Sequence, residues 1–258
     1  MTRYSRYAIA FQTIFTKEVL RFMRIWLQTI LPPVITTVLY YIIFGNLIGS
    51  RIGEMDGVSY IDFIVPGLIL MAVITNAYSN VVSSFFSSKF QRHVEELIIS
   101  PVPNWVILAG YVAGGVARGV MVGIAVTTVS LFFTDIQVQS YGWTLTVFIL
   151  TAILFSLAGF INAVYANSFD DVSIVPTFIL TPLTYLGGVF YSINMLPEFW
   201  QKVSLANPIL YMVNAFRYGL LGVSDISMGV ALGIVILFIV ALTGFSLYLL
   251  NRGIGIKS

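Results

Sequence analysis

Long apolar stretches alternate with short polar segments along this chain, and six of the stretches are long enough to cross a lipid bilayer. A membrane-spanning helix needs about 20 predominantly apolar residues. The six stretches cover residues 25–48, 61–86, 106–133, 143–166, 173–193 and 228–250. The sequence therefore predicts an all-α polytopic membrane protein with six transmembrane helices, in which residues 1–258 form one transmembrane domain.

Residues 4–24 precede the first span and have the pattern of an amphipathic helix. Apolar and aromatic side chains recur at helical spacing, at Tyr4, Tyr7, Phe11, Ile14, Phe15, Val19, Phe22 and Trp26. Polar and basic side chains occupy the opposite face, at Arg6, Thr13, Lys17, Arg21 and Arg24. This arrangement predicts an N-terminal interfacial helix on the membrane surface. An extension of the first span is the alternative.

The composition supports a membrane location and excludes several kinds of function. Of the 258 residues, 58% are hydrophobic and only 9% are charged, whereas soluble domains carry about 25% charged residues. The net charge of +2 argues against a nucleic-acid partner. Because the chain has no cysteine and His93 is its single histidine, we expect no metal site and assign no catalytic residue.

Lysine and arginine are unevenly distributed between the two sides of the predicted bundle. Cytoplasmic loops carry the excess of these residues in membrane proteins. With the N-terminus in the cytoplasm, that side receives Arg3, Arg6, Lys17, Arg21, Arg24, Lys89, Arg92, Arg252 and Lys257. The outer side receives Arg51, Lys202 and Arg217, while Arg118 falls within the membrane. Both termini are therefore expected in the cytoplasm.

The cytoplasmic segment between the second and third spans contains the pattern of a short helix. Phe90, Val94 and Leu97 are spaced as on one helix face, with charged residues between them. Pro101 ends the pattern, because the residue before a proline is disfavoured in the helical region. We expect a short amphipathic helix parallel to the membrane; a solvated connecting loop is the alternative.

Residues 194–222 are too apolar for a simple outer loop and too interrupted for a span. Asn207 can cap a helix whose first residue is Pro208, and Gly222 suits the position after its end. Irregular backbone at membrane depth must be covered by protein. We therefore expect two short helices that form an outer re-entrant hairpin.

Arg118 stands near the middle of the third span, where a charge costs about 2.5–3.5 kcal/mol on insertion scales. Two roles are open: contact with a substrate, or a structural hydrogen bond within the subunit, with Asn76 as a candidate partner. Glycines around Arg118 follow Gly-x-x-x-Gly spacing, which lets helices approach closely: Gly110, Gly114, Gly115, Gly119 and Gly123. Packing inside one subunit is favoured over dimerisation.

Tyrosines give the expected membrane path an aromatic and weakly polar character. Such a path suits a lipid, a glycan-bearing lipid or a hydrophobic drug, although interfacial anchoring explains tyrosines equally well. The candidate substrate-path residues are Tyr40, Tyr41, Asn76, Arg118 and Tyr185.

Prolines and paired glycines predict interruptions in two of the spans. They stand at Pro32 and Pro33 in the first span and at Pro176, Pro182 and Gly187-Gly188 in the fifth. Asp170 and Asp171 begin the fifth span, where carboxylates favour a helix N-terminus. Helix capping is therefore expected of this pair, rather than ion binding.

Two motifs in the polar segments carry a resemblance to a known family. They read Glu95-Glu96-Leu97-x-x-Ser100-Pro101 and Asn207-Pro208-x-x-Tyr211-x-x-x-Ala215-Phe216-Arg217-Tyr218-x-x-x-Gly222. With the order of surface helix, six spans and outer hairpin, they resemble the ABC-2 type permease family, the membrane subunits of ATP-driven exporters. The resemblance covers nearly the whole chain. Blocks at 21–26, 44–53, 89–92 and 169–171 are similar to one subgroup, inner-membrane permeases of Gram-negative bacteria.

The resemblance implies a transport subunit of the bacterial inner membrane, rather than an enzyme, that works with a separate ABC ATPase. The chain has no Gly-x-x-x-x-Gly-Lys-[Ser/Thr] motif to hold nucleotide phosphates, so ATP and Mg are expected on the partner. The family's coupling helix would correspond to residues 87–100. The candidate ATPase-coupling residues are Lys89, Arg92, Glu95, Glu96, Ser100 and Pro101, and those of the outer hairpin are Asn207, Pro208, Tyr211 and Arg217.

The expected assembly is a homodimer of this chain with two ATPases, surrounded by membrane lipids. Six spans are few for a complete path, and no inverted repeat is visible in the sequence. A membrane enzyme and a passive channel are the alternatives. The enzyme would need a nucleophile and a base, yet no Gly-x-Ser-x-Gly occurs. A channel would have no obvious use for residues 95–103.

Overall fold

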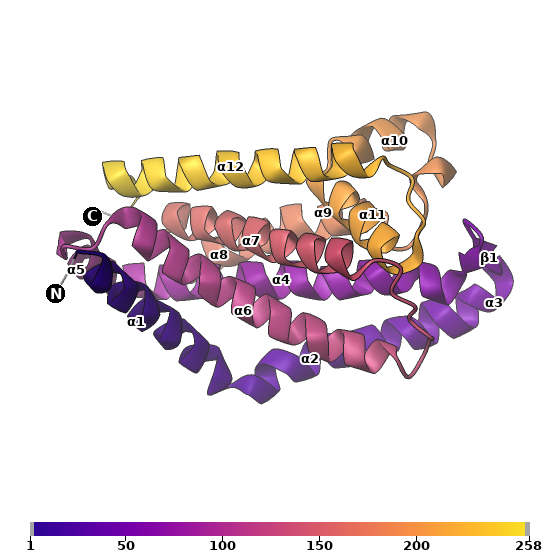
Figure 1. Cartoon of the computed structure of the whole chain (residues 1–258), viewed down its shortest axis with the longest axis horizontal. Coiled ribbons are helices and arrows are strands. Elements are labelled where there is room, and N and C mark those ends of the chain that lie inside the picture. The colour runs from indigo at the N-terminus through magenta and orange to yellow at the C-terminus, as the bar shows by residue number, and fades with distance from the viewer. Residues whose placement is uncertain (1–2, 256–258) are drawn as a thin grey trace.

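The computed structural model describes residues 3–255 as a bundle of helices that run roughly along one common direction (Figure 1). Within these residues, five helical stretches are long and apolar enough to cross a membrane: Trp26–Ile52, α4 (Tyr60–Phe90), α6 (Asn104–Ser130), α7 (Tyr141–Tyr165) and α12 (Met228–Arg252). All five match predicted spans to within a few residues. The prediction of an all-α polytopic membrane protein is confirmed at this level.

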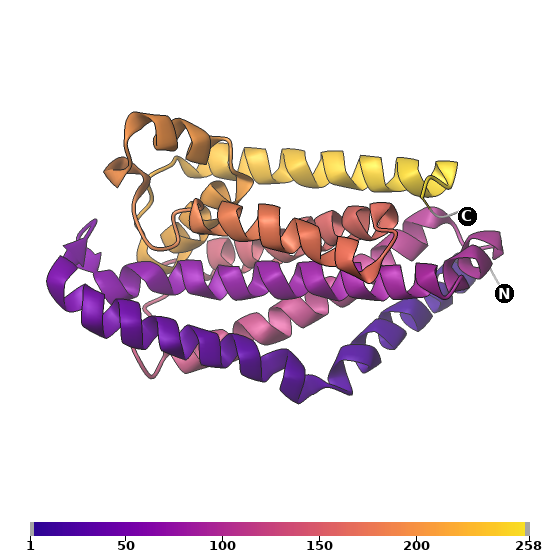
Figure 2. The ribbon, with the colours of Figure 1, turned by 180° about the vertical axis from the view of Figure 1, so that it is seen from behind.

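The predicted fifth span, 173–193, has different bounds and is not one regular helix. It consists of α8 (Phe169–Val175), a π-helical segment η2 (Pro176–Leu180) and α9 (Thr181–Tyr185). The helical path ends at Tyr185, and Gly188 then turns the chain with a φ of 71°, a conformation that glycine adopts readily. Figure 2 shows this segment beside α4, along only part of its length. The predicted span is too long because the glycine pair ends the helix earlier than hydropathy alone suggests.

The first span is bent at its start and irregular at its far end. The helix α1 (Arg3–Met23) ends before a turn, and α2 (Trp26–Tyr40) leaves at an angle (Figure 1). Pro32 and Pro33 lie within α2 without ending it, so the interruption expected there is wrong. The irregular part is instead the π-helix η1 (Tyr41–Ile48), followed by the single turn α3 (Gly49–Ile52). Membrane helices tolerate proline where neighbouring groups satisfy the freed carbonyls.

The centre of the bundle is α4, which packs against α6 and α7. In its most apolar window 78% of the residues are buried, against 12% for the stretch that begins with α2 and 17% for α12. The two outer helices therefore present most of their apolar side chains to their surroundings. In a membrane these faces meet lipid or another protein chain.

The glycine ladder of α6 packs inside the subunit, as predicted. A Cβ atom on Gly114 would lie 2.5 Å from Cβ of Glu18 in α1, and one on Gly119 would lie 3.0 Å from Cβ of Ala77 in α4. One on Gly123 would meet the ring of Phe148 in α7. The missing side chains thus let α6 approach three neighbours at once.

Short elements close the two ends of the bundle. One end carries the start of α1, the helix α5 (His93–Ile99) and the last turns of α12 (Figure 1). The opposite end carries the antiparallel pair β1 (Glu54–Met55) and β2 (Val58–Ser59), the turn η3 (Ile193–Met195), and the helices α10 (Glu198–Leu205) and α11 (Pro208–Leu221). The segments predicted for opposite membrane sides therefore lie at opposite ends.

We expect Gly115→Ala to destabilise the bundle. The new Cβ would lie 2.5 Å from Cγ2 of Val81 and 3.0 Å from the carbonyl oxygen of Ala77, and overpacking of this kind costs about 1–3 kcal/mol. The matched control is Gly233→Ala in α12, where a Cβ would meet no atom within 4 Å. Thermal unfolding in detergent measures both variants. Equal midpoints for the two would show that the close contact of α6 is not needed.

Candidate functional site

The predicted cytoplasmic helix 87–100 is divided between two elements. α4 continues to Phe90, Gln91 and Arg92 form a turn, and α5 begins at His93. Arg92 has a φ of 63°, which is uncommon for a residue other than glycine. The short helix expected within residues 87–100 is therefore present as α5, but it begins later than expected, because this turn separates it from α4. Ser100 is extended before Pro101 and ends α5 as expected.

The short helix α5 is held by one face and exposed on the other. Val94 is buried against the bundle, whereas Glu96 and Arg92 are exposed and Glu95 is half-buried. Ile99 is 84% exposed and Phe90 is 63% exposed. Since acidic and apolar side chains stand together on this end, the surface offers both charge and apolar area to a second protein.

Lys89 points into the bundle. Its ammonium group donates to the carbonyl oxygens of Val164 (2.6 Å) and Ala166 (2.7 Å), at the end of α7. A helix C-terminus leaves carbonyls unpaired and attracts cations. Lys89 therefore joins the end of α4 to the end of α7, beside the start of α8.

The start of α8 is closed by a capping box. Oγ of Ser168 accepts from the backbone N–H of Asp171, and the Asp171 carboxylate accepts from the backbone N–H of Asn167 (2.9 Å) and of Ser168 (3.1 Å). These hydrogen bonds, first that from Asn167, hold the pKa of Asp171 below its usual value. The capping role predicted for this carboxylate is confirmed.

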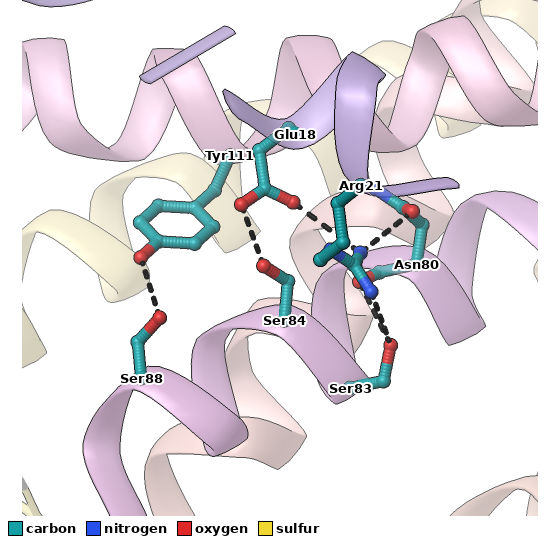
Figure 3. Close-up of polar contacts among 7 residues, drawn as sticks. All are labelled: Glu18, Arg21, Asn80, Ser83, Ser84, Ser88 and Tyr111. Carbon is teal, nitrogen blue, oxygen red and sulfur yellow. Dashed lines mark hydrogen bonds and ion pairs between the residues drawn. The ribbon is translucent and has the colours of Figure 1, made fainter. Parts of the chain in front are cut away.

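A buried polar network ties α1 to α4 and was missed in the sequence (Figure 3). Glu18 is fully buried; its carboxylate accepts from Oγ of Ser84 (2.6 Å) and lies 3.3 Å from Nη2 of Arg21. Nη2 of Arg21 also donates to Oδ1 of Asn80 (2.8 Å) and to its carbonyl oxygen (2.9 Å). Arg21 therefore faces α4, and its assignment to the opposite, polar face of α1 was wrong.

The position of Glu18 in the sequence could have predicted this network. Glu18 stands four residues from both Ile14 and Phe22, which are the two other buried side chains between residues 4 and 23 of α1. A carboxylate in the middle of a buried stripe needs partners on the neighbouring helices. Gly114 makes room for it on α6.

Arg118 opens onto a cavity of about 340 Å³ between α2 and α4. Tyr40 and Asn76 line the same cavity, so three of the predicted path residues lie together. The phenolic oxygen of Tyr185 lies 3.2 Å from that of Tyr40. The expected bond between Asn76 and Arg118 is absent among residues 3–255: Nδ2 of Asn76 donates to the carbonyl oxygen of Ala72.

Tyr41 lies in the core and not on this cavity. Its side chain is fully buried, its hydroxyl lies 2.6 Å from Oγ of Ser130, and its ring packs at 5.0 Å from that of Phe133. Tyr41 is next to Tyr40 in sequence, and adjacent helix positions face different directions. The structure therefore separates Tyr41 from Tyr40, Asn76 and Arg118, which line the cavity.

The helix α11, predicted as the second helix of an outer hairpin, has the cap that the sequence predicts. Oδ1 of Asn207 accepts from the backbone N–H of Ile209 (3.0 Å), Pro208 is the first residue of α11, and Gly222 ends it with a φ of 75°. The hydroxyl of Tyr211 donates to the carbonyl oxygen of Leu205 (2.6 Å), which connects α11 to the end of α10.

Arg217 lies in α11, within the segment predicted as the outer hairpin, and its side chain is buried in the bundle. Its side chain is 1% exposed and lies over the ring of Phe63, 3.8 Å from the ring centre. Nη2 donates to the carbonyl oxygen of Gly188 (2.5 Å) and Nε to that of Phe63 (3.4 Å). The cation is buried because the chain turn at Gly188 leaves a carbonyl that needs a donor.

Comparison with known proteins identifies the family. Residues 9–221 match the profile of the ABC-2 type transporter family. The chain belongs to the ABC-2 type transporter family. The inner membrane transport permease YadH of Escherichia coli strain K12 is 60% identical over 252 residues, 98% of each chain. Nodulation protein J of Rhizobium meliloti strain 1021 is 24% identical over 240 residues, 93% of this chain and 92% of its own.

The resemblance inferred from the Glu95 and Asn207 motifs is confirmed, including the subgroup. The blocks at 21–26, 44–53, 89–92 and 169–171 were assigned to the YadH type of permease, and the identity to YadH supports this. In this ABC-2 type transporter chain, α5, the Arg118 cavity and the outer hairpin are three separate places along one bundle. They are joined by α4.

We expect Glu18→Ala to destabilise the protein by about 1–3 kcal/mol, because it leaves buried partners in Ser84 and Arg21 without their acceptor. Glu18→Gln should lose less, since an amide oxygen still accepts from Ser84. The control is Lys17→Ala, next to it on the exposed side of α1. Chemical unfolding in mixed micelles measures all three. The network is not needed if Glu18→Ala and Lys17→Ala unfold alike.

The capping box predicts a pH-dependent contribution from Asp171. Because its folded-state pKa is lower than the unfolded value, near 3.9, the stabilisation is present above that value and is lost as the pH falls through the folded-state pKa. Asp171→Asn should therefore be less stable than the unsubstituted protein at pH 7, and the difference should shrink below about pH 4. Asp170→Asn is the neighbouring control. A pH-independent difference in unfolding temperature would contradict the assignment.

Proposed function

We propose that this chain is the permease subunit of an ATP-binding cassette exporter in the bacterial inner membrane. It would move a hydrophobic or amphiphilic substrate, such as a lipid, a glycolipid, a polysaccharide or a drug-like molecule. The observation that carries the proposal is the family match over residues 9–221. The relative with 60% identity is an inner membrane transport permease, which supports the location.

The energy for transport would come from a partner chain. The sequence has no P-loop motif, and a phosphate-binding loop of that type is what holds the nucleotide in such ATPases. ATP and Mg would therefore bind to an ABC ATPase subunit, and this chain would act as a transport subunit and not as an enzyme.

The helix α5 is suited to contact that ATPase. It is exposed, carries Glu95 and Glu96, and is followed by the rigid turn at Ser100 and Pro101. Arg92 is exposed beside it, whereas Lys89 contributes by fixing the end of α4 to α7. Since α5 follows α4 after a single turn, force applied to α5 reaches the centre of the bundle through one helix.

Two copies of the chain would form the transport path. Among the five helical stretches of the described chain that are long and apolar enough to cross a membrane, the least buried are α12 and the one that begins with α2. They leave apolar faces for a second copy and for lipid. The excess of Lys and Arg near α1, α5 and the end of α12 favours a cytoplasmic position for that end and for both termini. The hairpin of α10 and α11 would then cover the path on the outer side, with Asn207, Pro208, Tyr211 and Arg217 fixing its shape.

Charge reversal on α5 tests the proposal. The double variant Glu95→Lys, Glu96→Lys should insert normally, because neither side chain lies in a long apolar helix. It should retain the co-expressed ATPase at a level lower by about tenfold or more, since like charges across an interface cost several kcal/mol and about 1.4 kcal/mol already corresponds to tenfold. ATP-driven export should fall with it.

The matched control makes the same charge change at the opposite end. Glu54 and Glu198 are both exposed there, so Glu54→Lys, Glu198→Lys should leave ATPase retention unchanged. Pull-down of the ATPase from solubilised membranes measures both. Undiminished ATPase retention and export in the Glu95, Glu96 variant would refute the role of α5, and a permease that retains no ATPase at all would favour a channel.

A further inference from the structure

The cavity between α2 and α4 contains one charge and no countercharge. Its wall on α2 is formed by positions that follow helical spacing from Gln28 to Tyr40, and its wall on α4 runs from Leu68 to Asn76. Arg118 projects from α6 behind them, and no Asp or Glu lines the cavity. The cavity is therefore cationic, although most of the surface around it is apolar.

Arg118 is the group of this cavity that still needs a partner. Its Nε is buried without an acceptor, and none of the hydrogen bonds or ion pairs within residues 3–255 involves its side chain. Nearby polar groups already bond to their own helices: Oγ1 of Thr75 donates to the carbonyl of Met71, and Nδ2 of Asn76 donates to that of Ala72. An unpaired charge within a membrane span is costly. An anion beside the guanidinium would remove this cost and accept its free donors.

The surroundings of the cavity indicate an amphiphile and not a free ion. Pro32, Leu68 and Met71 form apolar parts of the wall. Next to it, α2 exposes Leu31, Ile35 and Leu39 on its outer face. The volume of about 340 Å³ is at the lower end of ligand pockets, which measure about 300–1,000 Å³. It can hold a head group while a hydrocarbon chain lies along α2.

We propose that this cavity binds an anionic amphiphile, whose phosphate or carboxylate group pairs with Arg118 while its apolar chain lies against α2. A planar guanidinium matches both groups with two parallel hydrogen bonds. The ligand is a resident lipid of the membrane or a transported molecule, and the recognition chemistry is the same for both. The binding does not depend on an ATPase, so it stands apart from the function proposed above.

Lipid binding by the purified full-length chain in detergent tests the site. The probe is fluorescent phosphatidylglycerol, with fluorescent phosphatidylcholine as the zwitterionic comparison. We expect the unsubstituted chain to bind phosphatidylglycerol more tightly than phosphatidylcholine. Phosphatidylglycerol binding should weaken about tenfold or more in Arg118→Gln and should be largely kept in Arg118→Lys. Arg24→Gln, an exposed cation at the start of the first span, should bind normally. Equal phosphatidylglycerol binding by Arg118→Gln, or no preference for phosphatidylglycerol, would overturn the proposal.

A second measurement does not require the Arg118 variants to fold. Because the chain has no cysteine, Thr36→Cys introduces a single thiol in the cavity wall, where a nitroxide label can be attached. The control is Leu237→Cys, on the exposed face of α12. In nanodiscs, phosphatidylglycerol should reduce label mobility at position 36 relative to phosphatidylcholine and leave position 237 unchanged. The same response at both positions would show annular lipid only and would refute the site. An immobile label at position 36 in both lipids would also refute the site, because this result is expected if a second copy filled the cavity.

Adding the partner ATPase and ATP distinguishes a resident lipid from a transported molecule as the ligand. A resident lipid keeps the label immobile during turnover, whereas a transported amphiphile leaves and the mobility rises. Both results support the anion site. If phosphatidylglycerol binds through Arg118 but no ATPase associates, the site stands and the proposed exporter function fails.

Discussion

The close contact of α6 with its neighbours is the constraint on which the rest of the bundle depends. Helices in lipid gain little from the hydrophobic effect, so they associate through tight packing and polar bonds. The glycines of α6 allow α1, α4 and α7 to approach along one helix. α4 is thereby buried over most of its length and becomes the support for the polar attachments of the other elements. α1 is fixed to it by Glu18 and Arg21, and α11 is fixed to it by Arg217 over Phe63.

The cations inside the bundle show how the broken helices are stabilised. Where α7 ends, Lys89 supplies donors to two free carbonyls, and where the fifth span ends early, Arg217 does the same for Gly188. Arg21 has a carboxylate and an amide as partners. Within the described residues, each of these three cations donates to at least two oxygens of the chain itself, although Nε of Arg21 and Nη1 of Arg217 are buried without an acceptor. Arg118 donates to no oxygen of the described chain, and this difference supports the proposal that its cavity is a binding site.

The sequence was sufficient for features that depend on local pattern. Hydropathy located the long helices, the cap at Asn207 and the end at Gly222 followed from backbone preferences, and glycine spacing indicated the packing of α6. It was insufficient where partners come from distant segments. The burial of Glu18 depends on Ser84 and on the gap at Gly114, and that of Arg217 depends on the turn at Gly188. Pro32 and Pro33 misled for a related reason, because the cost of a missing hydrogen bond depends on what surrounds the freed carbonyl.

The two walls of the Arg118 cavity differ in helix regularity and burial, and from this difference we infer which wall can open the cavity. α4 is one continuous helix of 31 residues that carries α5 at one end and Phe63 near the other. α2 is largely unburied, and at Tyr40 it passes into eight residues of π-helix, a form with poorer hydrogen-bond geometry that is frequent at functional sites. In the proposed exporter, a displacement of α5 would therefore move the α4 wall as a rigid unit. The cavity would therefore change shape mainly through movement of α2, whose outer face is the one available to lipid and to a second copy.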